Sequence, residues 1–197
     1  MSKIKNTKLK IMVASTVYNF KTDLEQICST LTGFGYHVIN SHIGTIKSLG
    51  HDPTKACLKA VAECDFFLGI ILPHYGSGIT HQEISKSIEL DKPRCFLVHR
   101  DVTVSRKLLE QFIYTDIKNR VKNPSFIFKK TSVLENIKVI DMYNEAIQDD
   151  QPIMNRRWAH EFTNYNLDGS PFIITQFEDK KEVEKFISEY NKNKVSK

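Results

Sequence analysis

The feature that most constrains the fold of this chain is a regular alternation between short apolar runs and helix-like segments in its first hundred residues. The apolar runs predict buried strands at 9–15, 36–40, 65–72 and 93–98. They are continuous rather than alternating, as expected for central strands covered on both faces. Strands and helices at this spacing predict βαβ units, so we expect a flavodoxin-like α/β fold with a doubly wound, mainly parallel sheet between two helical layers.

Helix boundaries in this half are marked by residues with known positional preferences. A helix that starts near Thr22 has apolar residues on one face and stops at Gly33 and Gly35. Asp52-Pro53 predicts a second helix start, because aspartate caps a helix and proline fits its first turn. A third helix is expected after the turn at 76–78.

The second half of the chain is less regular. We expect helices at 105–121, 132–148 and 179–191, strands at 124–130 and 172–175, and a connection at 149–171 around a short segment at Trp158. We therefore divide the chain into an α/β core at 1–103 and a mostly helical C-terminal extension at 104–197 that completes the fold.

Composition is ordinary for a soluble globular protein, with 41% hydrophobic and 26% charged residues. No apolar run reaches the roughly 20 residues that a membrane span needs. The first ten residues lack the apolar stretch of a secretion signal. We therefore expect a cytoplasmic protein with no membrane partner.

The net charge of +5 comes from the two ends of the chain. These ends contain seven lysines and no acid, which leaves the intervening body at −2; the lysines are Lys3, Lys5, Lys8, Lys10, Lys192, Lys194 and Lys197. A nucleic-acid groove needs basic residues clustered within the folded part, so we expect no nucleic-acid partner.

Four cysteines, Cys28, Cys57, Cys64 and Cys95, lack Cys-x-x-Cys spacing, and we expect them to be reduced. The seven histidines form no metal-ligand spacing. We expect no metal site and no cofactor.

Polar and aromatic residues follow the predicted strands where the carboxyl ends of a parallel sheet would meet. Ligands in open sheets bind beyond these ends. The residues are those of 14–18 after the first strand, 40–42 after the second, 73–77 after the third and 99–101 after the fourth. This edge is where we expect a binding site.

Glu83, at the start of the third helix, has two interpretations. Thr80 and Glu83 have capping-box spacing, in which the carboxylate only satisfies a backbone N–H. The same spacing recurs three times, at Thr22 with Glu25, Ser132 with Glu135, and Thr175 with Glu178. A carboxylate in the first turn after a loop of small residues can equally be catalytic. The spacing leaves both roles open.

An ordered set of short motifs in the first hundred residues resembles a known family. The elements are Ser15-Thr16, Cys64-Asp65 with Gly69, Tyr75-Gly76-Ser77, Thr80 with Glu83, and Lys92-Pro93. Together they resemble a bacterial branch of the TIR-like domains in the nucleoside 2-deoxyribosyltransferase superfamily. The resemblance covers about half of the chain and implies a TIR-like version of the α/β fold.

The resemblance also implies roles for individual residues. Glu83 matches the glutamate that acts at the anomeric carbon of an N-riboside. Substrate contacts are expected from residues of both loops and of the third strand: Ser15, Thr16, Tyr18, Phe20, Asp65, His74, Tyr75 and Ser77. His74 and His81 are candidates for protonating a purine leaving group. The chain lacks the Ser/Cys-containing signature that the better-known TIR enzymes carry around this glutamate.

The expected chemistry is cleavage of a C1′–N bond. Positive charge builds on the sugar, and a carboxylate beneath C1′ stabilises the oxocarbenium ion or attacks it. Nicotinamide leaves NAD as a neutral molecule, so one carboxylate suffices. We therefore expect a TIR-like signalling or defence protein that cleaves or rearranges the N-glycosidic bond of NAD or a related nucleotide. NAD or the nucleotide would be the substrate and not a cofactor.

Two alternatives stay open: a nucleoside or nucleotide deoxyribosyltransferase or hydrolase, and a non-catalytic module that binds a nucleotide or protein. We expect a homo-oligomer, and a protein effector is a further candidate partner. Aromatic residues of the second half are candidates for the dimer surface: Tyr143, Trp158, Phe162 and Phe172.

Overall fold

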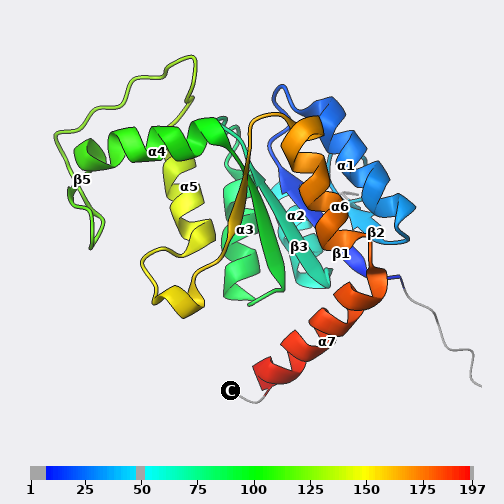
Figure 1. Ribbon diagram of the computed structural model, residues 1–197. Helices are drawn as coiled ribbons and strands as arrows, with labels where there is room; N and C mark the ends of the chain where they lie inside the picture. The colour runs from blue at the N-terminus through cyan, green and yellow to red at the C-terminus, as the bar shows by residue number, and fades with distance from the viewer. Residues whose placement is uncertain (1–7, 48–51, 196–197) are drawn as a thin grey trace, which may run out of the picture.

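A five-stranded parallel sheet forms the centre of the molecule (Figure 1). The structure is a computed structural model and describes residues 8–47 and 52–195. The strand order is β2-β1-β3-β4-β7, and every neighbouring pair is parallel. The strands are β1 (Lys10–Ser15), β2 (His37–Ile39), β3 (Phe66–Ile71), β4 (Arg94–His99) and β7 (Ala159–Phe162).

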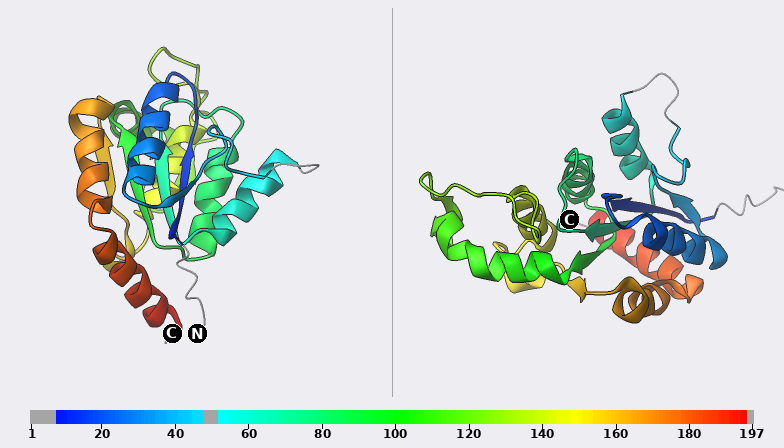
Figure 2. Two further views of the ribbon diagram at one scale, coloured as in Figure 1. Left: turned by 90° about the vertical axis from the view of Figure 1, so that its right-hand side faces the viewer. Right: turned by 90° about the horizontal axis from the view of Figure 1, so that it is seen from above.

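Helices cover both faces of this sheet (Figures 1 and 2). One face packs against α1 (Lys21–Gly33), α6 (Ser170–Phe177) and α7 (Lys180–Val195). The other face packs against α2 (Pro53–Glu63), α3 (Ile79–Glu89), α4 (Arg100–Ile113) and α5 (Lys138–Ile147). The expected three-layer, doubly wound α/β class is therefore confirmed.

Alternate residues of each strand enter opposite halves of the core. Ile11 and Val13 belong to the cluster under α1, whereas Met12 and Ala14 belong to the cluster under α2 and α3. All six residues of β3 are buried. The double cover explains why the strands read as continuous apolar runs in the sequence.

The elements predicted in the first hundred residues are confirmed to within one or two residues at their ends. Asp52 caps α2 as expected, since its carboxylate accepts a hydrogen bond of 2.8 Å from the backbone N–H of Thr54. Pro53 occupies the first turn of that helix.

The second half differs from the prediction in several places. Residues 124–130 form no strand, and the predicted strand at 172–175 lies inside the helix α6. The helix expected at 105–121 is α4, which begins at Arg100 and ends at Ile113; the chain then forms a short antiparallel hairpin of β5 (Tyr114–Asp116) and β6 (Val121–Lys122). Short 3-10 and π turns flank β7, at Ile153–Asn155 and Tyr165–Gly169.

The predicted boundary at 103/104 falls within α4. The C-terminal half contributes to the sheet, because β7 adds the fifth strand beside β4. In addition, α6 packs against α1 and α5 packs against α3. Both halves therefore contribute to one sheet.

None of the four Thr-x-x-Glu or Ser-x-x-Glu spacings forms a capping box. Gly78, with φ of 77°, is the N-cap of α3, so Thr80 and Glu83 both lie inside the helix. No side-chain cap is present at the start of α1, and no helix starts at Ser132. Thr175 lies within α6, and the carboxylate of Asp179 instead accepts from the N–H groups that open α7.

Candidate functional site

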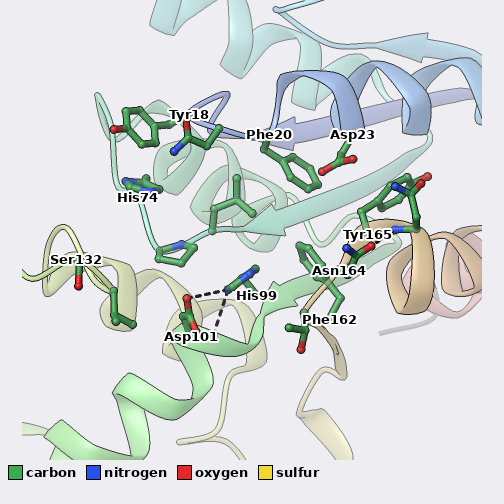
Figure 3. Close-up of a pocket in the computed structure, with 16 residues that line it drawn as sticks. Tyr18, Phe20, Asp23, His74, His99, Asp101, Ser132, Phe162, Asn164 and Tyr165 are labelled. Atoms are coloured by element: carbon green, nitrogen blue, oxygen red, sulfur yellow. Dashed lines mark hydrogen bonds and ion pairs between the residues drawn. The ribbon is translucent and has the colours of Figure 1, made fainter.

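A cavity of about 330 Å³ lies at the carboxyl edge of the sheet (Figure 3). Its walls come from the segments that follow β1, β3, β4 and β7, together with Ser132 and Val133. Of the site residues predicted from the sequence, Tyr18, Phe20 and His74 lie in these walls. We refer to this cavity as the edge pocket.

Aromatic rings form much of the edge pocket. The rings of Tyr18 and His74 lie 4.0 Å apart between centroids at an interplanar angle of 42°. The rings of His99 and Phe162 meet edge to face at 5.4 Å. Phe20 is 5% exposed and packs against Phe162 in the core, so it supports the wall from behind.

The ionisable groups of the edge pocket have distinct surroundings. Burial lowers the pKa of His74, so its imidazole is neutral at neutral pH. Burial raises the pKa of Asp23, in the first turn of α1. His99 caps α4 by accepting from the N–H of Asp101 at 3.2 Å, and the Asp101 carboxylate lies 3.5 Å from the same ring.

Glu135 fixes the loop that follows β3. Its carboxylate accepts from the N–H of Tyr75 at 2.9 Å and from that of Gly76 at 3.3 Å. These hydrogen bonds, with that of Gly76 first, lower the pKa of Glu135. Its own N–H donates to Pro73 O at 3.0 Å. The sequence suggested a cap for this residue, but it anchors a loop of the site.

Tyr75 and His81 belong to a hydrogen-bonded chain that joins α3 to α5. The hydroxyl of Tyr75 lies 2.9 Å from Nδ1 of His81, and Nε2 of His81 lies 2.9 Å from the Glu145 carboxylate. The hydrogen bond from His81 is the main cause of the lowered pKa of Glu145. His81 is therefore engaged on both ring nitrogens and is not placed as a proton donor for a leaving group.

Glu83 lies away from the edge pocket, between α3 and α2. It is 4% exposed, and it interacts with the thiol of Cys57 on α2. Burial raises its pKa to about 7. No ion pair to Glu83 occurs among the described residues. Glu83 thus does not cap α3, and it does not line the edge pocket.

Apart from Asp65, the remaining predicted contact residues lie at the end of β1 and in the loops after β1 and β3. Ser15 donates to Thr16 O at 2.8 Å, and the buried hydroxyl of Thr16 has no hydrogen-bond partner among the described atoms. Thr16 lies against Gly76, where a Cβ would come within 3.6 Å of its methyl group. Ser77 is exposed in the loop before α3.

Asp65 requires a correction. It precedes β3 at the amino end of the sheet, where its carboxylate accepts from the N–H of Lys10 at 2.8 Å. A strand of six residues separates it from the carboxyl edge, a distance of roughly 20 Å. Asp65 therefore holds the starts of β1 and β3 together and lies too far from the site to contact a ligand there.

The aromatic residues expected at a dimer surface are mostly packed inside the protein. Phe162 is 2% exposed, whereas Phe172 and Tyr143 are partly buried against the two core clusters. Trp158 alone of the four is exposed, at 81%. Among the residues that the sequence argument missed, Asp23 and Asn164 line the edge pocket and Cys57 contacts Glu83. These three come from separate parts of the chain, and no motif connects them.

Across the described ranges, every helix is too short or too polar to cross a bilayer. Within the same ranges, no three His, Cys, Asp or Glu side chains gather closely enough to hold a metal ion.

Comparison with known proteins agrees with this architecture. A structure of the activated Roq1 resistosome directly recognizing the pathogen effector XopQ contains TIR domains that match 87% of this chain and 99% of that chain, with a TM-score of 0.55 at 14% identity. The TIR-like fold is therefore confirmed, whereas the link to the nucleoside 2-deoxyribosyltransferase superfamily stays a prediction. No curated protein sequence matches the chain. Residues 10–196 match the family described as "Domain of unknown function (DUF4062)", and the chain belongs to that family.

Proposed function

We propose that this chain is a TIR-like signalling or defence domain that cleaves or rearranges the N-glycosidic bond of NAD or a related nucleotide, with Glu83 as the reacting carboxylate. One observation carries the proposal: Glu83 is buried on α3 with a pKa raised to about 7 and without a basic partner among the described residues. Such groups are costly, and they concentrate at functional sites.

The chemistry fits a carboxyl group with this pKa. When ionised, Glu83 can stabilise or attack the positive sugar carbon after the C1′–N bond weakens. When protonated, it can donate a proton to a purine base. Near neutral pH both forms are populated, since the pKa lies at about 7.

Because Glu83 is buried, the proposed reaction requires a conformational change first. At 4% exposure, the Glu83 carboxylate meets a substrate only after α2 and α3 separate around Cys57 and Glu83. Self-association is our proposed trigger. The matched TIR domains belong to an activated resistosome that recognises a pathogen effector, which favours a defence role and a protein partner for this chain as well.

The outer face of α4 is our candidate for self-association. Val104, Leu108 and Phe112 recur at every fourth residue and are 40%, 62% and 51% exposed. Ile117 and Val121 of the neighbouring hairpin region are also half exposed. Exposed apolar residues grouped along one helix face are typical of an interaction surface. We expect Leu108→Glu to weaken self-association by at least about tenfold, because a buried charge opposes the contact.

Sedimentation of wild type and Leu108→Glu over a concentration series measures this effect. Lys107→Glu, a charge change at the neighbouring exposed position, is the control and should leave association nearly unchanged. Equal association of Leu108→Glu and wild type would show that this face is not the interface.

The direct test of the reaction is base release. Purified protein is incubated with NAD, nucleosides and nucleotides, with and without a crowding agent, and the free base is measured by chromatography. A second free base added as acceptor reveals deoxyribosyl transfer. We expect release that increases with crowding. If none of the compounds in the panel releases its base, the enzymatic proposal is wrong.

A second candidate function is non-catalytic ligand binding. The observation that favours it is the separation of the edge pocket, with Tyr18, Phe20 and His74, from Glu83. In that case a ligand binds at the carboxyl edge and no bond is broken. Binding without base release would favour this candidate.

A further inference from the structure

The edge pocket has the form of a ligand site independent of Glu83. Five segments distant in the sequence converge on it, and side chains from several of them point toward the same space in Figure 3. A cavity of about 330 Å³ is at the lower end of the size found for small-molecule sites. Its lining therefore indicates what kind of ligand it accepts.

The walls favour a flat ring. Tyr18 is 60% exposed, although its ring lies 4.0 Å from that of His74. His99 also lines the pocket and is half-buried, and its ring meets the buried ring of Phe162 edge to face at 5.4 Å. The exposed ring of Tyr18 suits a planar ligand, because ring pairs stack or meet edge to face.

The charge of the lining disfavours phosphate. No lysine or arginine lies among the described residues that line the pocket, whereas Asp23 and Asp101 both do. His74 is neutral at neutral pH, since burial lowers its pKa. A phosphate group would thus meet two carboxylates without a cationic side chain in the lining.

Asp23 is the carboxylate available to a ligand. Asp101 already pairs with His99 and lies in the first turn of α4. Asp23 has no hydrogen bond or ion pair among the described residues, and burial alone accounts for its raised pKa. Asp23 is half-buried, and a cationic ligand would supply the ion pair that no described side chain gives to its carboxylate.

Positive groups near the pocket are few. The positive charge of Lys130, which does not line the pocket, lowers the pKa of His74. Arg100 pairs with Glu161 at 4.0 Å. The N-termini of α1 and α4 also face this edge, with partial positive charge of about half a unit each. Asp23 and Asp101 outweigh these partial charges.

From the exposed Tyr18 ring and the unpaired carboxylate together, we propose that the edge pocket binds a small planar ring compound with a cationic head, which pairs with Asp23 while its ring stacks on Tyr18. The site is separate from the reaction proposed at Glu83. A cationic ligand bound in the edge pocket would then regulate the domain from the carboxyl edge of the sheet.

Three isosteric probes test the proposal: benzamidinium, benzamide and benzoate, which are planar and differ in charge. Titrations of the full chain at pH 7.5, followed by amide chemical shifts in NMR spectra, give their dissociation constants. We expect benzamidinium to bind at least about tenfold more tightly than benzamide, and benzoate to bind most weakly. The largest shifts are expected at the amides of Asp23 and Asn164.

Variants assign the selectivity to the pocket. Asp23→Asn should bring benzamidinium to the affinity of benzamide, and Asp23→Glu should restore part of the difference. Tyr18→Ala should weaken benzamidinium and benzamide together. Glu189→Gln removes an exposed acid on α7 and is the matched control, with no expected effect. Each variant is first checked for an unchanged melting temperature.

Several results would overturn the proposal. They are equal binding of benzamide and benzamidinium, preference for benzoate, shifts located outside the pocket, or full selectivity in folded Asp23→Asn. Glu83→Gln should bind benzamidinium as wild type does. Failure of base release therefore leaves this proposal intact, and failure of probe binding leaves the reaction at Glu83 intact.

Discussion

Glu83→Gln is expected to become more stable relative to wild type as the pH rises. The pKa of Glu83 is about 7 in the folded protein and 4.5 in its ordinary range, so the folded state binds a proton more tightly than the unfolded state. The stability that this proton gives is complete below pH 4.5. It is lost as the pH rises through 7, by roughly 3 kcal/mol in total.

Glutamine at this position cannot ionise, so it does not undergo this loss. Its amide adds donors that need partners in a buried place, at a cost of about 1–3 kcal/mol that does not depend on pH. The informative quantity is therefore the difference in the free energy of unfolding between variant and wild type at two pH values. We expect it to shift by roughly 3 kcal/mol in favour of glutamine between pH 4.5 and pH 8.

Urea unfolding at both pH values measures this shift. Glu89→Gln on the same helix is the control, because Glu89 is exposed and pairs with Lys86 across the surface. For Glu89→Gln, the difference from wild type in the free energy of unfolding should change by less than about 1 kcal/mol between the two pH values. A Glu83→Gln difference that stays constant with pH would show that the pKa of Glu83 is not raised by folding.

Gly69→Ala is expected to destabilise the protein by roughly 3 kcal/mol. Gly69 lies in the middle of the fully buried strand β3, opposite Phe96 of β4. A Cβ there would lie 2.7 Å from Cδ1 of Phe96 and 3.2 Å from the ring of Phe67. Both rings are completely buried, so neither can move away without disturbing the core.

Thermal and urea unfolding test this prediction, and a second substitution tests its cause. Phe96→Leu in the Gly69→Ala protein should recover part of the loss, so that the two changes are not additive. Gly33→Ala near the end of α1 is the matched control. A Cβ at Gly33 meets nothing within 4 Å, and we expect its effect to stay within about 1 kcal/mol. Additive changes at 69 and 96 would contradict the packing argument.

The first hundred residues could be predicted well because their core strands are covered on both faces. Double cover gives β1, β3 and β4 continuous apolar centres, and this is the pattern that a single sequence displays most clearly. β7 was missed because it is an edge strand with only Phe162 buried. Its sequence, AHEF, has no apolar run to distinguish it from a loop.

The two segments wrongly predicted as strands have strand-like sequence patterns, but their tertiary surroundings give them another structure. Phe126 and Phe128 pack partly against the core while Ile127 is 82% exposed, which is the alternation of a strand. No neighbouring strand hydrogen-bonds to this segment, so it stays irregular. At 170–177, Pro171 in the first turn and the burial of Ile173 and Phe177 four residues apart favour a helix over the strand that the β-branched residues suggested.

The candidate site could be predicted only in its location. The polar residues after the parallel strands predicted a pocket at the carboxyl edge, and the edge pocket lies there. The spacing of Thr80 and Glu83 could not distinguish a cap from a buried acid, because that depends on the packing of α2 against α3. The fixed loop at 73–76 also depends on a distant residue, Glu135.

Base release by wild type and Glu83→Gln, measured side by side from NAD and the nucleoside and nucleotide panel, tests the central claim most directly. We expect release by wild type and a loss of at least about 100-fold in the variant, with no loss of stability at pH 8. A folded Glu83→Gln protein that releases base at the wild-type rate would contradict the claim that Glu83 is the reacting carboxylate.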